Sequence, residues 1–177
     1  MRQFKKQLWV LSIAAAAFCL PAPSAHAQQA FSSFPVSAAV AAVCSISTAP
    51  LAFGNYDPIV ANATTPLDIN GSVTVTCTKG TQVYIELNPG THTGNAVGTT
   101  RAMQSGASDF LDYELFSENT LSTIWGLGDP GAGGNGFAPV PAANRNPRTF
   151  PIYGRVLAGQ DSAVGNYTDV VQATVNF

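Results

Sequence analysis

Two cysteines supply the thiol groups in the main body of this 177-residue chain. Cys44 and Cys77 lie 33 positions apart, and a third cysteine, Cys19, stands in an apolar stretch near the N-terminus. Two thiols left together in an exported protein are expected to form a disulfide, because compartments outside the cytosol are oxidising. The interpretation of this pair therefore depends on whether the chain is exported.

Other reactive side chains are too few to predict an enzyme. His92 is the one histidine beyond residue 27, and a lone histidine can neither complete a zinc site nor serve a catalytic triad. Asp112 and Glu114 would share one side of a strand, a spacing that a glycosidase pair could tolerate. They alternate with apolar residues, so we expect them on a solvent-facing surface. The sequence predicts no enzyme and no cofactor.

The first 27 residues indicate export. They begin with three basic residues, continue through an apolar run over 8–20 and end on Ala25-His26-Ala27, a small-x-small cleavage pattern. The apolar run is shorter than the roughly 20 residues of a membrane-spanning helix. We therefore predict a secretory signal peptide over 1–27, with Cys19 removed in it. Cys44 and Cys77 are then a predicted disulfide, worth about 3–4 kcal/mol for a loop of this length.

Charge excludes several classes of partner for the remaining 150 residues. The signal holds three of the eight basic residues, which leaves five against ten acids and a net charge of −5. No basic cluster supports nucleic-acid or anionic-membrane binding. No second apolar run of membrane-spanning length follows, so the mature chain is predicted to have no membrane span.

The dominant pattern after residue 43 is apolar alternation with a period of two, which predicts half-buried strands. It is clearest over 69–78, 82–88 and 167–177, and weaker over 110–117 and 149–158. Thr78-Lys79-Gly80-Thr81 is predicted to be a hairpin link between the first two. Short strands separated by Gly, Pro and Asn clusters predict an all-β, Ig-like antiparallel sandwich over 44–177.

The segment 28–43 does not resemble an ordinary frayed terminus. Five apolar residues fall on one face of an extended chain here: Phe34, Val36, Ala38, Val40 and Ala42. We call these five residues the ladder. It could be the first strand of its own sandwich, or it could insert into a neighbouring subunit by β-augmentation.

The other end of the chain favours insertion. The sequence stops on an alternating strand that could be the sixth of an Ig-like order, which would leave a seven-stranded sandwich one strand short. A missing strand would expose an apolar groove and an unpaired edge. The ladder has the right shape to fill such a groove, from the same chain or from another.

The longest irregular stretch, 126–148, is a possible ligand loop, because long loops often carry function. Arg145 and Arg148 flank Pro147 and could form a small ligand patch, although loop solubility explains them equally. Trp125 stands at the mouth of the loop. If exposed it could stack on a sugar, but the average burial of tryptophan favours a place in the core.

Several motifs resemble those of spore coat U domain proteins, which are similar to subunits of archaic chaperone–usher pili. The C-terminal motifs are Tyr153-Gly154-Arg155-Val156, Ala158-Gly159-Gln160 and Gly165-Asn166-Tyr167-Thr168-Asp169 before Ala173-Thr174-Val175-Asn176-Phe177. Further matches are Cys44-Ser45-Ile46, Phe53-Gly54-Asn55-Tyr56-Asp57-Pro58, the strand around Cys77, and Trp125-Gly126. The resemblance covers nearly all of the mature chain. Leu157, where the family often has proline, and the long 129–148 loop depart from it.

The resemblance implies an incomplete Ig-like fold, one strand short, completed by an N-terminal donor strand formed by the ladder. It also implies a periplasmic chaperone that lends a strand, an outer-membrane usher, and identical or related pilin subunits as partners. The predicted protein is thus a fimbrial subunit exported through the periplasm to the cell surface for attachment or biofilm formation. The alternatives are a lectin-like binding subunit and a self-complemented coat protein, whose own ladder fills its groove.

Overall fold

A computed structural model describes residues 28–94, 96, 98–106 and 109–177, so the predicted signal peptide lies outside the described residues. The described chain divides into two units at Ala38 and Ala39. Residues 28–38 form no strand, and their side chains are exposed. Residues 39–177 contain every regular element and form the β-domain.

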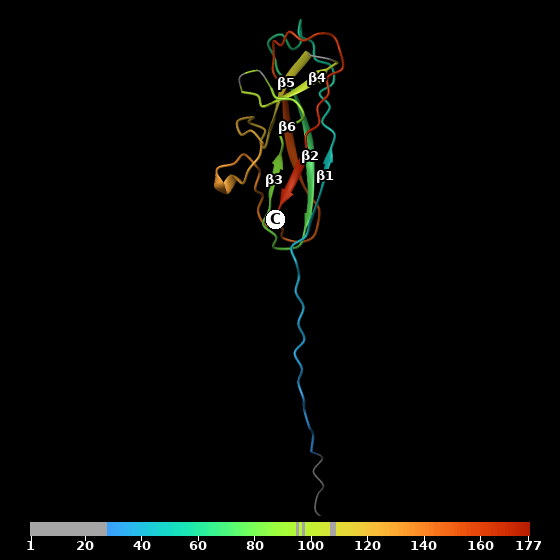
Figure 1. Ribbon diagram of the computed structural model, residues 1–177, viewed down its shortest axis with the longest axis vertical. Helices are drawn as coiled ribbons and strands as arrows, with labels where there is room; N and C mark the ends of the chain where they lie inside the picture. Colours follow the sequence, from blue (N-terminus) through green and yellow to red (C-terminus); the bar gives the residue numbers. More distant parts are fainter. Residues whose placement is uncertain (1–27, 95, 97, 107–108) are drawn as a thin grey trace, which may run out of the picture. The chain divides into compact units, whose positions relative to one another are not determined.

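The β-domain is a sandwich of two antiparallel sheets (Figure 1). The larger sheet has the strand order β1-β2-β6-β5-β4, and the smaller one pairs β3 with β7. The strand bounds are β1 (Cys44–Ala49), β2 (Leu67–Cys77), β3 (Tyr84–Leu87), β4 (Arg101–Ser105), β5 (Asp109–Phe116), β6 (Arg148–Val156) and β7 (Ala173–Asn176). The one helical element among the described residues is the 3-10 turn η1 (Pro130–Ala132). The all-β, Ig-like antiparallel prediction is confirmed.

The core lies between the two sheets and follows the predicted alternation. On β2, Val73, Val75 and Cys77 are buried, whereas the residues between them are half-exposed. Ile85 and Leu87 of β3 face them from the smaller sheet and are also fully buried. Strict alternation thus places one face of β2 and one face of β3 in the interior, as period-two side-chain geometry requires.

The predicted disulfide between Cys44 and Cys77 is present. The two cysteines are register partners at the start of β1 and the end of β2. Their Cα atoms are 4.2 Å apart, close to the roughly 4.5 Å of a non-hydrogen-bonded antiparallel pair. The bond therefore fixes the first residue of β1 to the end of the central strand β2.

Three local expectations were wrong. Strands β1 and β4 were missed because neither alternates clearly, so the terminal strand is the seventh in this count and not the sixth. The 78–81 segment is a turn, with the Thr81 amide 3.1 Å from the Thr78 carbonyl. It joins two sheets and is not a hairpin link, because β2 and β3 do not pair.

The third error concerns Asp112 and Glu114, which are buried and not solvent-facing. Glu114, 1% exposed, forms an ion pair with the guanidinium of Arg101 and accepts the Thr100 amide at 2.6 Å. Asp112 accepts the amide of Ala96 at 2.6 Å. The chain before β4 covers this face of β5, and alternation alone cannot show that a loop will do so.

Candidate functional site

The β-domain contains an apolar groove of about 970 Å³. Its floor comes from the inner faces of both sheets, with Leu87 of β3, Leu111, Tyr113 and Leu115 of β5, and Ile152 of β6. Its two walls are the segments 48–56 and 162–171. These floor residues are themselves only 1–6% exposed, so the groove reaches down to the hydrophobic core between the two sheets.

The wall that leads into β7 ends on an unpaired strand edge. Asn88 donates its amide to the Gln172 carbonyl at 3.0 Å, and its side-chain Oδ1 accepts the Gln172 amide at 2.8 Å. Gln172 thus faces β3, and in antiparallel geometry alternate residues face the opposite way. The backbone groups of Val171, Ala173 and Val175 therefore point away from β3, with no partner strand among the described residues.

The edge of β1 is also unpaired on the side away from β2. The Thr78 amide donates to the Val43 carbonyl at 2.9 Å, so Val43 faces β2. By the same alternation, the backbone groups of Cys44, Ile46 and Thr48 face away from β2, where no strand pairs with them in the described part of the chain. Apolar floor and two open edges together form the kind of site that accepts a β-strand.

A buried carboxylate holds the β7-side wall in place. The Asp169 side chain is 1% exposed and accepts the Tyr113 hydroxyl at 2.6 Å and the Thr91 amide at 2.7 Å. Burial, together with the hydrogen bond to Asp169 and its charge, raises the pKa of Tyr113 far above its usual value. Tyr113 therefore stays protonated and keeps donating to Asp169.

A second carboxylate anchors the same wall nearer its start. Asp109 accepts the Ala163 amide and the Tyr167 hydroxyl, the latter at 2.8 Å. These hydrogen bonds, that of Ala163 first, hold the pKa of Asp109 below its usual value. The two tethers give physical roles to Tyr167 and Asp169, which the sequence marked only as part of a motif.

Two strand glycines make room for the opposite wall. A Cβ built on Gly154 would lie 2.9 Å from Phe53 Cζ and 3.0 Å from Leu51 Cδ2, and one on Gly71 would lie 2.9 Å from Leu51 Cδ1. Leu51 and Phe53 can therefore cross the inner face of β2 and β6. Sequence reasoning did not assign these two residues to the site, although a glycine inside a strand signals such close approach.

The ladder residues do not form part of the β-domain core. Phe34 is 81% exposed, and Val36 and Val40 are each 85% exposed. Ala38 and Ala42 are exposed as well, and no strand forms over 28–43. Five apolar side chains of one face of an extended segment are thus available for burial elsewhere.

The chain just before β1 continues along the line of that strand. The Thr78 hydroxyl donates to the Ala41 carbonyl at 3.2 Å, and the Val43 amide donates to the same hydroxyl at 3.2 Å. Residues 41–43 therefore extend the pairing of β1 with the end of β2.

The long loop does not present its tryptophan to solvent. Trp125 is fully buried and donates Nε1 to the Ile85 carbonyl at 2.8 Å, so it is a core residue that no sugar can reach in this structure. Arg145 is exposed. Arg148 donates Nη1 to the Val140 carbonyl at 2.6 Å and lies over the ring of Phe150. The structure thus does not bring these three residues together as one ligand site.

Metal and membrane sites were also sought within the described ranges. They hold no group of three or more His, Cys, Asp or Glu side chains that could bind a metal ion. In the same part of the chain, no helix has the length and apolar character needed to cross a bilayer. The groove is accordingly the candidate functional site.

Comparison with known proteins places this chain in a family. The model of the spore coat protein U domain matches residues 30–174. Protein U of Myxococcus xanthus is 34% identical over 184 residues, which covers 95% of this chain and 96% of that protein.

Solved structures show similarity of fold. One is a chain of the CsuC–CsuE chaperone–tip adhesion subunit pre-assembly complex from the archaic chaperone-usher Csu pili of Acinetobacter baumannii, with 22% identity and a TM-score of 0.54. The match covers 78% of this chain but only 40% of that one. The minor tip subunit HdaB of the E. coli Hda pilus is more distant, with a TM-score of 0.40 at 14% identity. On the family match and the identity to Protein U, this chain belongs to the spore coat protein U domain family.

Proposed function

We propose that this protein is a structural subunit of a bacterial surface fimbria or coat and that it polymerises by donor-strand exchange. The ladder of one copy would enter the groove of the next copy, where its backbone would pair with the free edges of β1 and β7. The observation that carries the proposal is the coexistence of an apolar groove between two unpaired edges with an exposed apolar ladder in one chain. Such a fibre would serve surface attachment or biofilm formation.

The lengths of the ladder and of the groove wall support this exchange. The ladder spans nine residues, roughly 30 Å at about 3.3 Å per residue in a strand. The wall that precedes and includes the start of β7 spans 162–173, which is of similar length. A strand in the groove would bury alternate apolar side chains on the floor and satisfy open backbone groups on both sides.

Insertion into a second copy has better support than insertion into the same domain. Residues 41–43 are hydrogen-bonded beside Thr78 as an extension of β1, so a return of the ladder would first have to break these bonds. A self-complemented coat protein would need that rearrangement, whereas a polymer would not.

An open groove also calls for protection before assembly. Exposed apolar surface beside free strand edges promotes non-specific association. We propose that a periplasmic chaperone lends a strand to the groove and that an outer-membrane usher assembles the subunits. Support comes from the fold shared with the chaperone–subunit complex of the Csu pili.

Size-exclusion chromatography of the mature protein, beside a variant that lacks residues 28–42, tests the proposal. The full chain should form polymers, or a ladder of oligomers when co-produced with its chaperone, and the truncated chain should form none. A full chain that stays a stable monomer, together with a truncated chain that unfolds, would instead show that the ladder completes its own domain.

A further inference from the structure

The β-domain carries free positive charge on a few residues only. Beyond residue 27 the chain has five basic residues, and two are held in ion pairs: Arg101 with buried Glu114, and Arg155 with Asp68 at 2.7 Å. The other three have no acidic partner among the described residues, namely Lys79, Arg145 and Arg148.

These three cations lie at one pole of the sandwich. The Gly80 amide donates to the Ala142 carbonyl at 2.7 Å, and the Ala142 amide donates to the Thr81 carbonyl at 3.2 Å. The turn with Lys79 is thereby tied to the chain that leads to Arg145. Arg148 begins β6 opposite Val75, two residues before the end of β2. We call the segments 78–81 and 140–148 the base.

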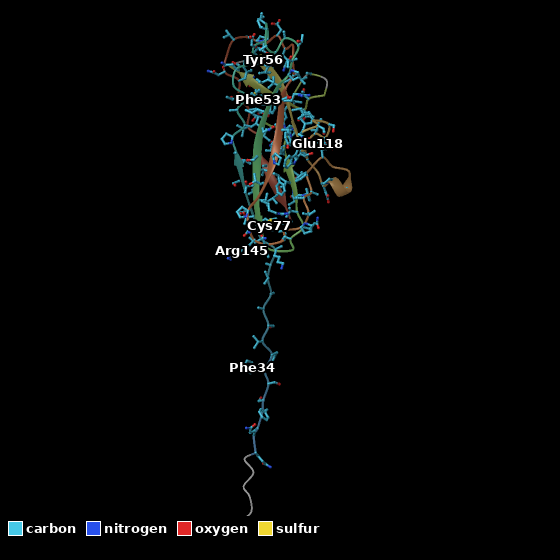
Figure 2. All side chains as sticks on the ribbon, turned by 180° about the vertical axis from the view of Figure 1, so that it is seen from behind. Phe34, Phe53, Tyr56, Cys77, Glu118 and Arg145 are labelled. Carbon is cyan, nitrogen blue, oxygen red and sulfur yellow. A yellow bond between two sulfur atoms is a disulfide. The ribbon has the colours of Figure 1, made fainter. Side chains whose placement is uncertain are left out.

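The base stays positive when its neighbours are counted. Neither of its two segments contains an acidic residue. Phe177 and Asp129 line the same small hollow as Gln82, next to the turn, and add two carboxylates. Three cations against these two anions leave a net charge of +1. Figure 2 shows Cys77 and Arg145 at this end and Phe53 and Tyr56 at the other.

The opposite pole, formed by the loops 50–66 and 157–168 with the start of β5, is negative. We call it the apex. The Gly159 amide donates to the Asn62 carbonyl at 2.8 Å, which ties its two loops together. It carries three acids that are not paired with a lysine or arginine: Asp57, Asp109 and Asp161. The arginine next to the apex, Arg155 near the end of β6, is neutralised by Asp68.

Two of these apex acids are held in the charged form by local hydrogen bonds. The amides of Val60 and Ile59 hold the pKa of Asp57 below its usual value. Hydrogen bonds from Ala163 and Tyr167 do the same for Asp109. The apex therefore keeps its negative charge well into the acidic range.

Strand direction decides which poles would meet in a polymer. β7 runs towards the base, because its Asn176 pairs with Tyr84, just after the base turn (Figure 1). A donor antiparallel to β7 would run from the base to the apex of the acceptor, and its own base would follow. A donor parallel to β7 would bring two positive bases together.

We infer that the positive base of one copy docks on the negative apex of the next copy as a second contact, separate from the donor strand. The inference rests on the proposed function, and it assigns Lys79, Arg145 and Arg148 a role in that assembly. Opposite charge on two facing surfaces accelerates encounter and disfavours the wrong orientation.

Arg148 adds an independent observation. Its Nε and Nη2 atoms are buried without any hydrogen-bond acceptor among the described residues. The Nε and Nη2 edge of a guanidinium is suited to two-point binding of a carboxylate. Because these two atoms are shielded in the isolated domain, an acid of a neighbouring copy would pair with them only if the Arg148 side chain turned outward on docking.

The test measures the rate of polymer growth for the full mature chain at low salt, by light scattering. Neutralising the exposed base residues with Lys79→Gln plus Arg145→Gln should slow growth about tenfold, the lower end of electrostatic rate effects. The control Asn119→Glu plus Ala132→Glu makes the same change in net charge on exposed side loops and should leave the rate within twofold. Raising the salt to about 0.5 M should remove most of the difference, because charges are then screened within a few ångströms.

The second part of the test exchanges the charges of one base residue and one apex residue. Lys79→Glu should slow growth, and Asp161→Lys in the same chain should restore part of the rate, because Asp161 forms no ion pair among the described residues that the exchange would break. Normal growth with Lys79→Glu, or slowing equal to that of the side-loop control, would overturn the docking of base on apex while leaving donor-strand exchange intact. If the unaltered chain forms no polymer under any condition, both ideas are wrong.

Discussion

Two regions of this chain carry the same alternating apolar pattern, but only one of them is paired with another strand in the described structure. The terminal segment 167–177 is held by the carboxylates of Asp109 and Asp169 and is paired with β3 over Ala173–Asn176. The ladder has the same period, yet its side chains are exposed and no strand pairs with it in the described structure. An alternating pattern thus specifies a strand-forming segment without specifying its partner, which tertiary contacts supply.

Charged side chains on the ladder would show most clearly that the ladder acts in assembly and not in the stability of the β-domain. Val36→Asp plus Val40→Asp should abolish polymers, because each carboxylate would have to be buried on the apolar floor of the groove. Thermal stability of the monomer should not change, since both side chains are exposed in it. Chromatography and thermal melts measure the two effects.

The matched control for this change is Ser37→Asp plus Ala39→Asp, on the opposite face of the same segment. It should leave assembly nearly normal. Equal loss of polymers in both variants would show that the side chains of the ladder face are not what the groove selects.

Reduction of the Cys44–Cys77 bond should have the next largest effect. The bond closes a loop of 33 positions, so its loss should lower the free energy of unfolding of the β-domain by about 3–4 kcal/mol. Because Cys44 directly follows the ladder, the same bond also anchors the root of the ladder to β2. Denaturant melts with and without reductant measure the change, and coincident curves would contradict it.

Gly154→Ala should disturb the groove wall that the ladder would meet. The new methyl group would contact Phe53 and Leu51 at about 3 Å, so we expect a loss of about 1–3 kcal/mol, the usual range for overpacking. Gly131→Ala in the exposed η1 turn is the control and should cost much less. Urea melts compare the two variants, and similar midpoints would show that the wall shifts freely.

The smallest expected effect is on the pH dependence of the anchored wall. The folded pKa of Asp109 is lowered, so its hydrogen bonds contribute stability above the unfolded value of about 3.8, and this contribution is lost as pH falls through the folded pKa. Asp109→Asn should therefore flatten the stability curve below about pH 4. A curve parallel to that of the unaltered protein would exclude this role for Asp109.

Most of the fold followed from local pattern, and the errors came where distant segments decide the environment. The strands β2, β5 and β6 were placed within about two residues by their apolar alternation, which is clear in β2 and weaker in β5 and β6. Glu114 was expected to face solvent, but Arg101 and the chain before β4 cover it. No spacing rule along β5 could reveal that cover, because the covering residues lie more than ten positions away.

Some features of the candidate site could also be predicted from the sequence, and others exist only in the tertiary structure. The ladder and the cysteine pair are consecutive or compositional features, so the sequence alone was enough to predict them. The groove belongs to the tertiary structure, since its walls and floor are brought together from β1, β3, β5, β6 and the segment before β7. The pairing partner of the ladder is undetermined for the same reason, because side-chain alternation is a local property, whereas an unpaired strand edge exists only once the two sheets have packed.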